Sequence, residues 1–162
     1  MTALADPPRS TVARWAGLAL FVAAVAAVAL IGTLAVTGTE GEYASLDRPA
    51  WAPPSWLFGP VWTVLYGLIA ISGWLVWRRV GWNAALVPYA VQLVLNAAWT
   101  PIFFGAGAYG WALLDIVAMW FAIGATMLVF WRISRPATLL LVPYLLWVSF
   151  ATALNAVIWS VN

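Results

Sequence analysis

Five long apolar runs, separated by short polar or glycine-containing segments, dominate the pattern along the chain. Each run has 22 to 24 residues, and a transmembrane helix needs about 20. Runs of this length predict helices that cross a bilayer with some tilt. The pattern therefore predicts an all-α integral membrane protein, a bundle of five transmembrane helices at residues 15–36, 56–77, 82–104, 109–131 and 136–159.

Composition supports this prediction and limits what else the chain can hold. Of the 162 residues, 65% are hydrophobic and 7% are charged, whereas soluble domains carry about 25% charged residues. We expect a short polar tail at residues 1–14 and a single membrane domain at 15–160. The one long connection, residues 37–55, contains the proline-rich cluster 49–54 around Trp51. This loop is predicted to be a lid, and a stiff connector is the alternative interpretation.

The arginines indicate an orientation. With five spans, six of the seven arginines fall on one side of the membrane, and only Arg48 falls on the other, among acidic residues. The positive-inside rule then places the N-terminus in the cytoplasm and the C-terminus on the opposite side, and favours a bacterial cytoplasmic membrane. The six arginines on the predicted cytoplasmic side are Arg9, Arg14, Arg78, Arg79, Arg132 and Arg135.

Missing residue types exclude most familiar catalytic and metal sites. The sequence contains no Cys, His or Lys, so it offers no thiolate, imidazole base or Schiff-base amine. We therefore predict neither a metal site nor an ordinary acid–base active site. The net charge of +2 is too small to indicate binding of nucleic acid. Aromatic residues are in excess, with 13 Trp, and those near predicted helix ends are typical of interfacial belts.

The remaining polar and aromatic residues fall in the half of the bundle nearest the long loop. Several repeat with a spacing of four residues, which places them on one face of a helix. Polar groups at this depth avoid lipid and face the bundle interior. For Gln92 and Asn96, a ligand pocket and interhelical hydrogen bonding fit equally well, and for Thr100 and Asn155 interhelical bonding is favoured. Residues spaced by four form three such stripes, each on one face of its helix: Gln92–Asn96–Thr100, Trp62–Tyr66 and Trp147–Ala151–Asn155.

At these positions the sequence resembles the TspO/MBR family of tryptophan-rich sensory and translocator proteins. The matching stretches are residues 43–54, 58–66, 92–101, 142–147 and 150–155. The resemblance implies a five-helix bundle, usually a homodimer, that binds protoporphyrin IX and related ligands beneath the long loop. The pocket residues that it implies are Tyr43, Trp51, Trp62, Tyr66, Gln92, Asn96, Trp147, Ala151 and Leu154.

Three functions follow from these observations. The first is a membrane receptor or carrier that binds porphyrins, either protoporphyrin IX or haem, requires no cofactor, and serves tetrapyrrole regulation or stress sensing. The second is an enzyme-like, light- and oxygen-dependent degradation of bound protoporphyrin through Trp51, Trp62 and Trp147. The third is a structural or interaction protein of the membrane. No basic residue follows Tyr144 in the fifth helix or its tail, so the sterol motif of animal members is not predicted.

Two helices carry small residues suited to the predicted homodimer interface. Close helix approach in membranes favours alanine and glycine at the contact. The two candidate faces are Ala19, Ala23, Ala26 and Ala27 in the first helix, and Ala90 and Ala97 in the third.

Overall fold

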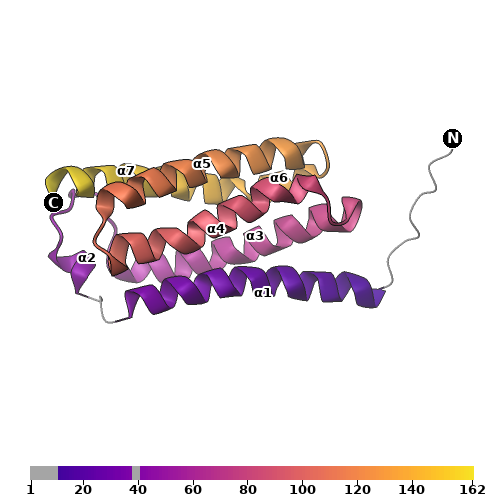
Figure 1. The fold of residues 1–162 in the computed structure, drawn as a ribbon, viewed down its shortest axis with the longest axis horizontal. Helices are drawn as coiled ribbons and strands as arrows, with labels where there is room; N and C mark the ends of the chain where they lie inside the picture. Colours follow the sequence, from indigo (N-terminus) through magenta and orange to yellow (C-terminus); the bar gives the residue numbers. More distant parts are fainter. Residues whose placement is uncertain (1–10, 38–40) are drawn as a thin grey trace.

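The computed structural model describes residues 11–37 and 41–162 (Figure 1). The first ten residues of the predicted tail, and residues 38–40 of the predicted lid, lie outside this range. The described chain is all helical and contains no strand. Its elements are α1 (Thr11–Val36), α2 (Glu42–Ser45), η1 (Ser55–Leu57), α3 (Phe58–Val80), η2 (Ala84–Leu86), α4 (Val87–Thr100), η3 (Pro101–Gly105), α5 (Tyr109–Trp131), α6 (Arg135–Leu140) and α7 (Val142–Val161).

The predicted five-helix membrane bundle is confirmed. Five helical spans in the described chain are long and apolar enough to cross a bilayer, and in a helix every backbone group finds its partner within the span. The second span runs to Val80, three residues past the predicted end, so Arg78 and Arg79 lie in its last turn. The spans are Thr11–Val36, Ser55–Val80, Ala84–Gly105, Tyr109–Trp131 and Arg135–Val161.

Two prolines interrupt spans that the sequence pattern predicts as continuous. Pro101 cannot donate to the carbonyl four residues earlier, and the chain follows with a π-turn in which the Ala106 amide donates to the Pro101 carbonyl at 2.9 Å. Pro143 likewise has no N–H to donate, and the fifth span is interrupted by a turn at Leu141, between α6 and α7. Pro60 and Pro88 lie in the first turns of α3 and α4, where a missing N–H costs nothing.

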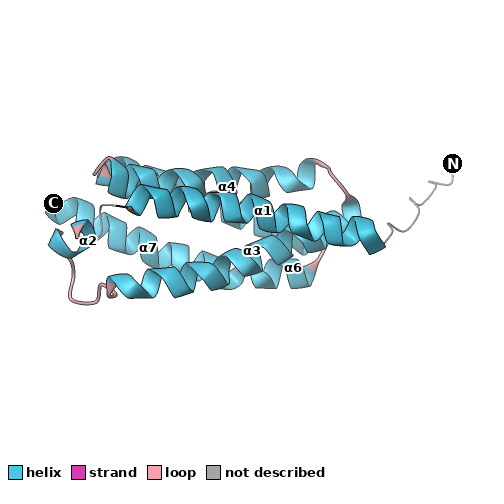
Figure 2. Ribbon diagram, turned by 90° about the horizontal axis from the view of Figure 1, so that it is seen from below, coloured by secondary structure: helices cyan, strands magenta, loops and turns pink. Residues whose placement is uncertain are grey.

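The helices pack closely at the end of the bundle where α1 begins. There α1 lies against α3, which also packs on α6, while α5 packs on α4 and α7 (Figures 1 and 2). A Cβ atom on Gly73 would lie 2.6 Å from the Tyr89 ring and 2.7 Å from the Phe21 ring. A Cβ atom on Gly17 would lie 2.1 Å from the Trp77 ring. Glycine is therefore what allows α1, α3 and α4 to approach at this end.

The described arginines also gather at this end, which we call the arginine end. Trp74 donates its indole N–H to the Arg14 carbonyl at 2.9 Å, so the first turn of α1 is adjacent to the last turns of α3. Arg79 donates to the Ile133 carbonyl, which brings the connection between α5 and α6 to the same place. Of the described arginines, Arg48 alone lies in the loop at the opposite end. The sequence prediction of a charge asymmetry therefore holds in space.

The opposite end, which we call the loop end, carries α2 and the proline-rich cluster. The side chain of Asn162, after α7, accepts from the Asp47 amide at 3.1 Å and donates to the Asp47 carbonyl at 3.0 Å. Trp51 packs edge-on against Phe150 of α7 at a centroid distance of 5.7 Å. The described part of the loop is thus folded against α7.

The homodimer remains a prediction. Of its two candidate faces, the one on α1 is exposed at all four alanines. On α4, Ala90 is exposed, whereas Ala97 is half-buried within the bundle.

Candidate ligand-binding pocket

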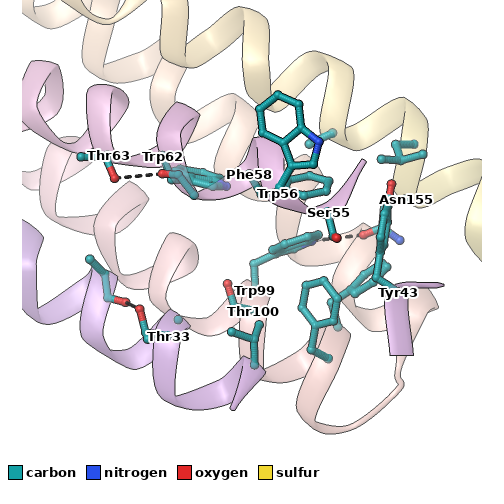
Figure 3. Close-up of a pocket in the computed structure, with 18 of the residues that line it drawn as sticks. Thr33, Tyr43, Ser55, Trp56, Phe58, Trp62, Thr63, Trp99, Thr100 and Asn155 are labelled. Atoms are coloured by element: carbon teal, nitrogen blue, oxygen red, sulfur yellow. Dashed lines mark hydrogen bonds between the residues drawn. The ribbon is translucent and has the colours of Figure 1, made fainter. Parts of the chain in front are cut away.

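A cavity of about 550 Å³ lies at the loop end and is lined by residues of α1, α2, η1, α3, α4, η3 and α7 (Figure 3). Small-molecule sites commonly have volumes of about 300–1,000 Å³, so the cavity is large enough for a ligand. Its walls are formed by Ala29, Gly32, Thr33, Val36, Tyr43, Ser55, Trp56, Phe58, Gly59, Trp62, Thr63, Tyr66, Trp99, Thr100, Phe103, Phe104, Ala151, Leu154, Asn155 and Ile158.

Aromatic rings form much of the wall. On α3, the rings of Trp62 and Tyr66 lie 5.2 Å apart and tilted by 31°. From α4 and η3, Trp99 stacks on Phe103 at 5.0 Å with 28° between the planes. The π-turn brings the neighbouring Phe104 into the same wall, 4.8 Å from Phe103. Stacked aromatic pairs of this kind favour flat ligands.

The polar groups of the wall are largely engaged with the protein. Trp99 donates its indole N–H to the Asn155 side-chain oxygen at 3.1 Å, and the Asn155 amide donates to the Tyr109 carbonyl at 2.9 Å. The Tyr43 hydroxyl donates to the Pro53 carbonyl at 3.1 Å. Burial raises the pKa of Tyr43, and the adjacent Arg48 opposes part of that rise, so the hydroxyl stays protonated. Shape and stacking are therefore the main means of recognition available here.

The structure brings five of the nine predicted pocket residues to the cavity. Three of them, Trp62, Tyr66 and Tyr43, present aromatic side chains, and Ala151 and Leu154 form the α7 wall. The other four lie outside the cavity wall, and a ligand contact for them remains a prediction. These four are Trp51, Gln92, Asn96 and Trp147.

Asn96 lies behind the wall, in a buried network that joins α3, α4, α5 and α7. Its side-chain oxygen accepts from the Tyr66 hydroxyl at 3.0 Å, and its amide donates to the Tyr144 hydroxyl at 3.0 Å. Tyr144 in turn donates to the Met119 sulfur at 3.3 Å. Asn96 thus holds Tyr66, which does line the cavity, from behind.

Gln92 lies one turn from Asn96, further from the loop end. Its side chain is 1% exposed, and neither atom of its amide has a hydrogen-bond partner among the described residues. A buried amide left in this state is destabilising, by about 1–3 kcal/mol.

The two tryptophans outside the wall pack on α7 and on the loop. Trp147 lies edge-on to Phe58 at 5.9 Å and next to Phe150 at 5.4 Å, so it supports a wall residue without reaching the cavity. Trp51 is 50% exposed and covers Phe150 from the loop. The structure therefore separates Trp62, which lines the cavity, from the other two candidate photo-oxidation residues.

The cavity also includes residues that neither the sequence pattern nor the family resemblance indicated. Four come from α1, whose alanine-rich run carries no distinctive motif: Ala29, Gly32, Thr33 and Val36. Trp56 in η1 and Phe58 at the start of α3 lie in or beside the stretches that resemble the family. Asn155 and Thr100 both line the cavity, and Asn155 also makes the interhelical bonds expected of it.

Ionisable groups contribute little to the cavity. The described residues contain no cluster of three His, Cys, Asp or Glu side chains able to hold a metal ion. Asp115 lies on α5 outside the wall, with one buried carboxylate oxygen that has no partner among the described residues. Arg48, a possible partner for it, instead lies 4.4 Å above the Tyr43 ring.

Five membrane spans around an aromatic cavity define a multi-pass α-helical membrane protein with an internal cavity of small-molecule size. Residues 19–160 match the TspO/MBR family, and the chain belongs to that family. Human translocator protein is 45% identical over 125 residues, 74% of each chain. Tryptophan-rich protein TspO of Chlorobaculum tepidum is 43% identical over 150 residues, 90% of this chain and 95% of the relative. The tryptophan-rich sensory protein of Cereibacter sphaeroides is 40% identical over 141 residues, 87% and 88% of the two chains.

Proposed function

We propose that the protein is a membrane receptor or carrier that binds porphyrins and similar flat, hydrophobic molecules in the loop-end cavity. The observation that carries this proposal is the presence of two aromatic walls from different helices, Trp62 with Tyr66 and Trp99 with Phe103, in one cavity. A planar macrocycle can stack on both walls, and each aromatic contact adds about 0.5–1.5 kcal/mol beyond burial. The family relatives named as translocators and sensory proteins support a role in transport or sensing.

The residues present favour a metal-free porphyrin at least as much as haem. Haem iron is usually held by His, Cys, Met or Tyr, and the sequence has neither His nor Cys. The described methionines, Met119 and Met127, lie outside the cavity wall, and the two tyrosines of the wall donate to Pro53 and Asn96. Protoporphyrin IX is therefore the proposed ligand, held through its ring faces, with tetrapyrrole regulation or stress sensing as the proposed role.

A titration of the purified protein with protoporphyrin IX in the dark tests this proposal. We expect saturable quenching of Trp fluorescence, because Trp62 and Trp99 lie in the wall. Trp62→Leu should weaken binding by about 2- to 12-fold, since the loss of one aromatic contact costs about 0.5–1.5 kcal/mol. Trp111→Leu, at an exposed position outside the wall, is the control and should bind like the parent. Absence of saturable binding would reject the receptor function.

Light-driven degradation of bound protoporphyrin is the second candidate. It is supported by Trp62 and Trp99, two oxidisable indoles in direct reach of a ligand in the cavity. Illuminating the complex in air would then convert the porphyrin to a product and consume oxygen. Binding that is unchanged by illumination identifies a receptor, whereas loss of the porphyrin spectrum only in the presence of protein and light identifies degradation.

We propose an orientation with the arginine end in the cytoplasm of a bacterial cell and the loop end outside, following the positive-inside rule. The sequence has no cysteine, so single cysteines report sidedness cleanly. Ala106→Cys, at the loop end, should react with an impermeant maleimide added to intact cells, and Ala84→Cys should react only after lysis. Both positions are exposed in the structure. Labelling of Ala84→Cys from outside would reverse the orientation, and equal labelling of both would contradict an odd number of spans between the ends.

A further inference from the structure

The loop beside the cavity is tied to the end of α7 by a specific contact. The Asn162 carboxamide makes three hydrogen bonds: it accepts from the Asp47 amide at 3.1 Å, and donates to the Asp47 carbonyl at 3.0 Å and to the Ile158 carbonyl at 2.9 Å. One side chain thus pairs with both backbone groups of a loop residue and with the last turn of α7. We call this contact the latch.

Aromatic contacts fix the same loop over the cavity. Tyr43 is 5% exposed and lies edge-on to Phe58 at 5.3 Å. Arg48 covers the outer face of the Tyr43 ring at 4.4 Å, and Trp51 rests on Phe150. The described loop residues are therefore held against α3 and α7, and displacing the loop would break these contacts together with the latch.

The side of the cavity that faces the bilayer is different, because α1 and α3 separate toward the loop end (Figure 2). At the arginine end the two helices touch through Gly17 and Gly73. Beside the cavity, by contrast, a Cβ atom on Gly59 of α3 would meet no described atom within 4 Å. Thr33 on α1 and Thr63 on α3 line the cavity and are both exposed (Figure 3). The cavity is therefore open between the two helices.

The rim of this opening is suited to lipid. The Thr33 hydroxyl donates to the Ala29 carbonyl at 2.9 Å, and the Thr63 hydroxyl donates to the Gly59 carbonyl at 2.9 Å. Each hydroxyl is satisfied within its own helix, which is the condition for placing threonine against hydrocarbon. The remaining rim residues on α1, Ala29 and Val36, are apolar.

We propose that the ligand enters and leaves the cavity from the membrane, through the opening between α1 and α3, while the latched loop stays closed. This proposal rests on the proposed function, since it names the route of the same hydrophobic ligand. A flat apolar molecule concentrates in the bilayer because burial of its apolar surface is favourable there. The bilayer thus supplies it directly at the depth of the opening. Thr33, Gly59 and Thr63 form the entrance, and Asn162 is the positioning residue that keeps the other side shut.

The first test narrows the entrance. In liposomes of phosphatidylcholine, Thr63→Phe should slow association of protoporphyrin IX by about tenfold, because entry then requires a rearrangement of the side chain. A helical side chain points toward the preceding turn, so the phenyl ring would lie over Gly59. Dissociation should slow as well, so that the Kd changes much less than either rate. Val64→Phe, at the neighbouring position, which is 63% exposed and outside the cavity wall, is the matched control and should keep the parent rates.

The second test locks the latch. Asp47→Cys and Asn162→Cys, introduced together into this cysteine-free chain, can be joined by a short bis-maleimide. Entry from the membrane predicts equal association rates before and after cross-linking. Entry through the loop predicts that cross-linking abolishes association, which would overturn the proposal, as would parent rates in Thr63→Phe.

A parallel measurement separates this proposal from the proposed function. Pyrene is a flat hydrocarbon without porphyrin chemistry. Its binding to the parent, Thr63→Phe and Val64→Phe is measured by energy transfer from the wall tryptophans. If the parent binds neither probe, both the pocket function and its entrance are rejected. If it binds pyrene alone, the porphyrin function fails while the entrance is still decided by the variants. If it binds either probe and Thr63→Phe matches Val64→Phe, the entrance alone is rejected.

Discussion

Replacing Asn96 with leucine is expected to lower the free energy of unfolding by about 1–4 kcal/mol, the largest stability effect of any single polar residue in the bundle. The Asn96 side chain bonds to the hydroxyls of Tyr66 and Tyr144 at 3.0 Å each. Interhelical hydrogen bonds in membranes contribute about 0.6–2 kcal/mol each, and leucine would break both. Tyr66 would also lose its support at the cavity wall, so porphyrin affinity should fall with stability.

Gln92→Met is the matched variant for this prediction, with the opposite expected sign. Gln92 is as deeply buried as Asn96, yet its amide has no partner within the described chain. Replacing an unsatisfied buried amide with an apolar side chain of similar length should leave stability unchanged or raise it. Porphyrin affinity should stay within about twofold, because Gln92 is outside the wall. Thermal unfolding in detergent, with a titration of each variant, measures both quantities.

Two results would contradict this interpretation. Equal destabilisation by Asn96→Leu and Gln92→Met would mean that Gln92 has a bonding partner of its own. A large loss of affinity in Gln92→Met without a loss of stability would place Gln92 in contact with the ligand, as the family resemblance implied.

Ala151→Thr is expected to weaken porphyrin binding by about 5- to 150-fold. Ala151 is 9% exposed and lies in the cavity wall, one turn from Trp147 on α7. A branched side chain there must project into the cavity or displace its neighbours, and overpacking of this kind costs about 1–3 kcal/mol. At about 1.4 kcal/mol per tenfold change in Kd, that cost produces the stated loss when it falls on the bound state.

Ala153→Thr provides the control for Ala151→Thr. Ala153 lies on the same helix, is exposed, and is outside the wall, so it tests the effect of threonine on α7 itself. A threonine hydroxyl can bond to the carbonyl four residues earlier and bend the helix, and this effect is common to both variants. Titration of both proteins with protoporphyrin IX, alongside melting curves, separates the two contributions. Affinity of Ala151→Thr within twofold of Ala153→Thr would remove Ala151 from the pocket.

The number and limits of the helices could be predicted from the sequence because they depend on local properties. A bilayer requires about 20 consecutive apolar residues per helix, and the five runs are visible without knowledge of their neighbours. The helix breaks were less predictable. Pro88 and Pro101 are both prolines in apolar runs, but one begins a helix and the other opens a π-turn. Which outcome a proline has depends on the packing of the residues that follow it.

The sequence alone determined the fold class, the family, the charge asymmetry and five of the cavity residues, because spacing along one helix and a recurrent motif carry that information. Only the tertiary structure decided how the faces of different helices combine. It placed Asn96 behind Tyr66, moved Trp147 and Trp51 out of the wall, and brought the motif-poor α1 into it. A stripe of polar residues shows that a helix faces the interior. Whether that face meets a cavity or another side chain depends on the crossing of its neighbours, here α1 and α3 touching at Gly17 and Gly73 and separating beside Gly59.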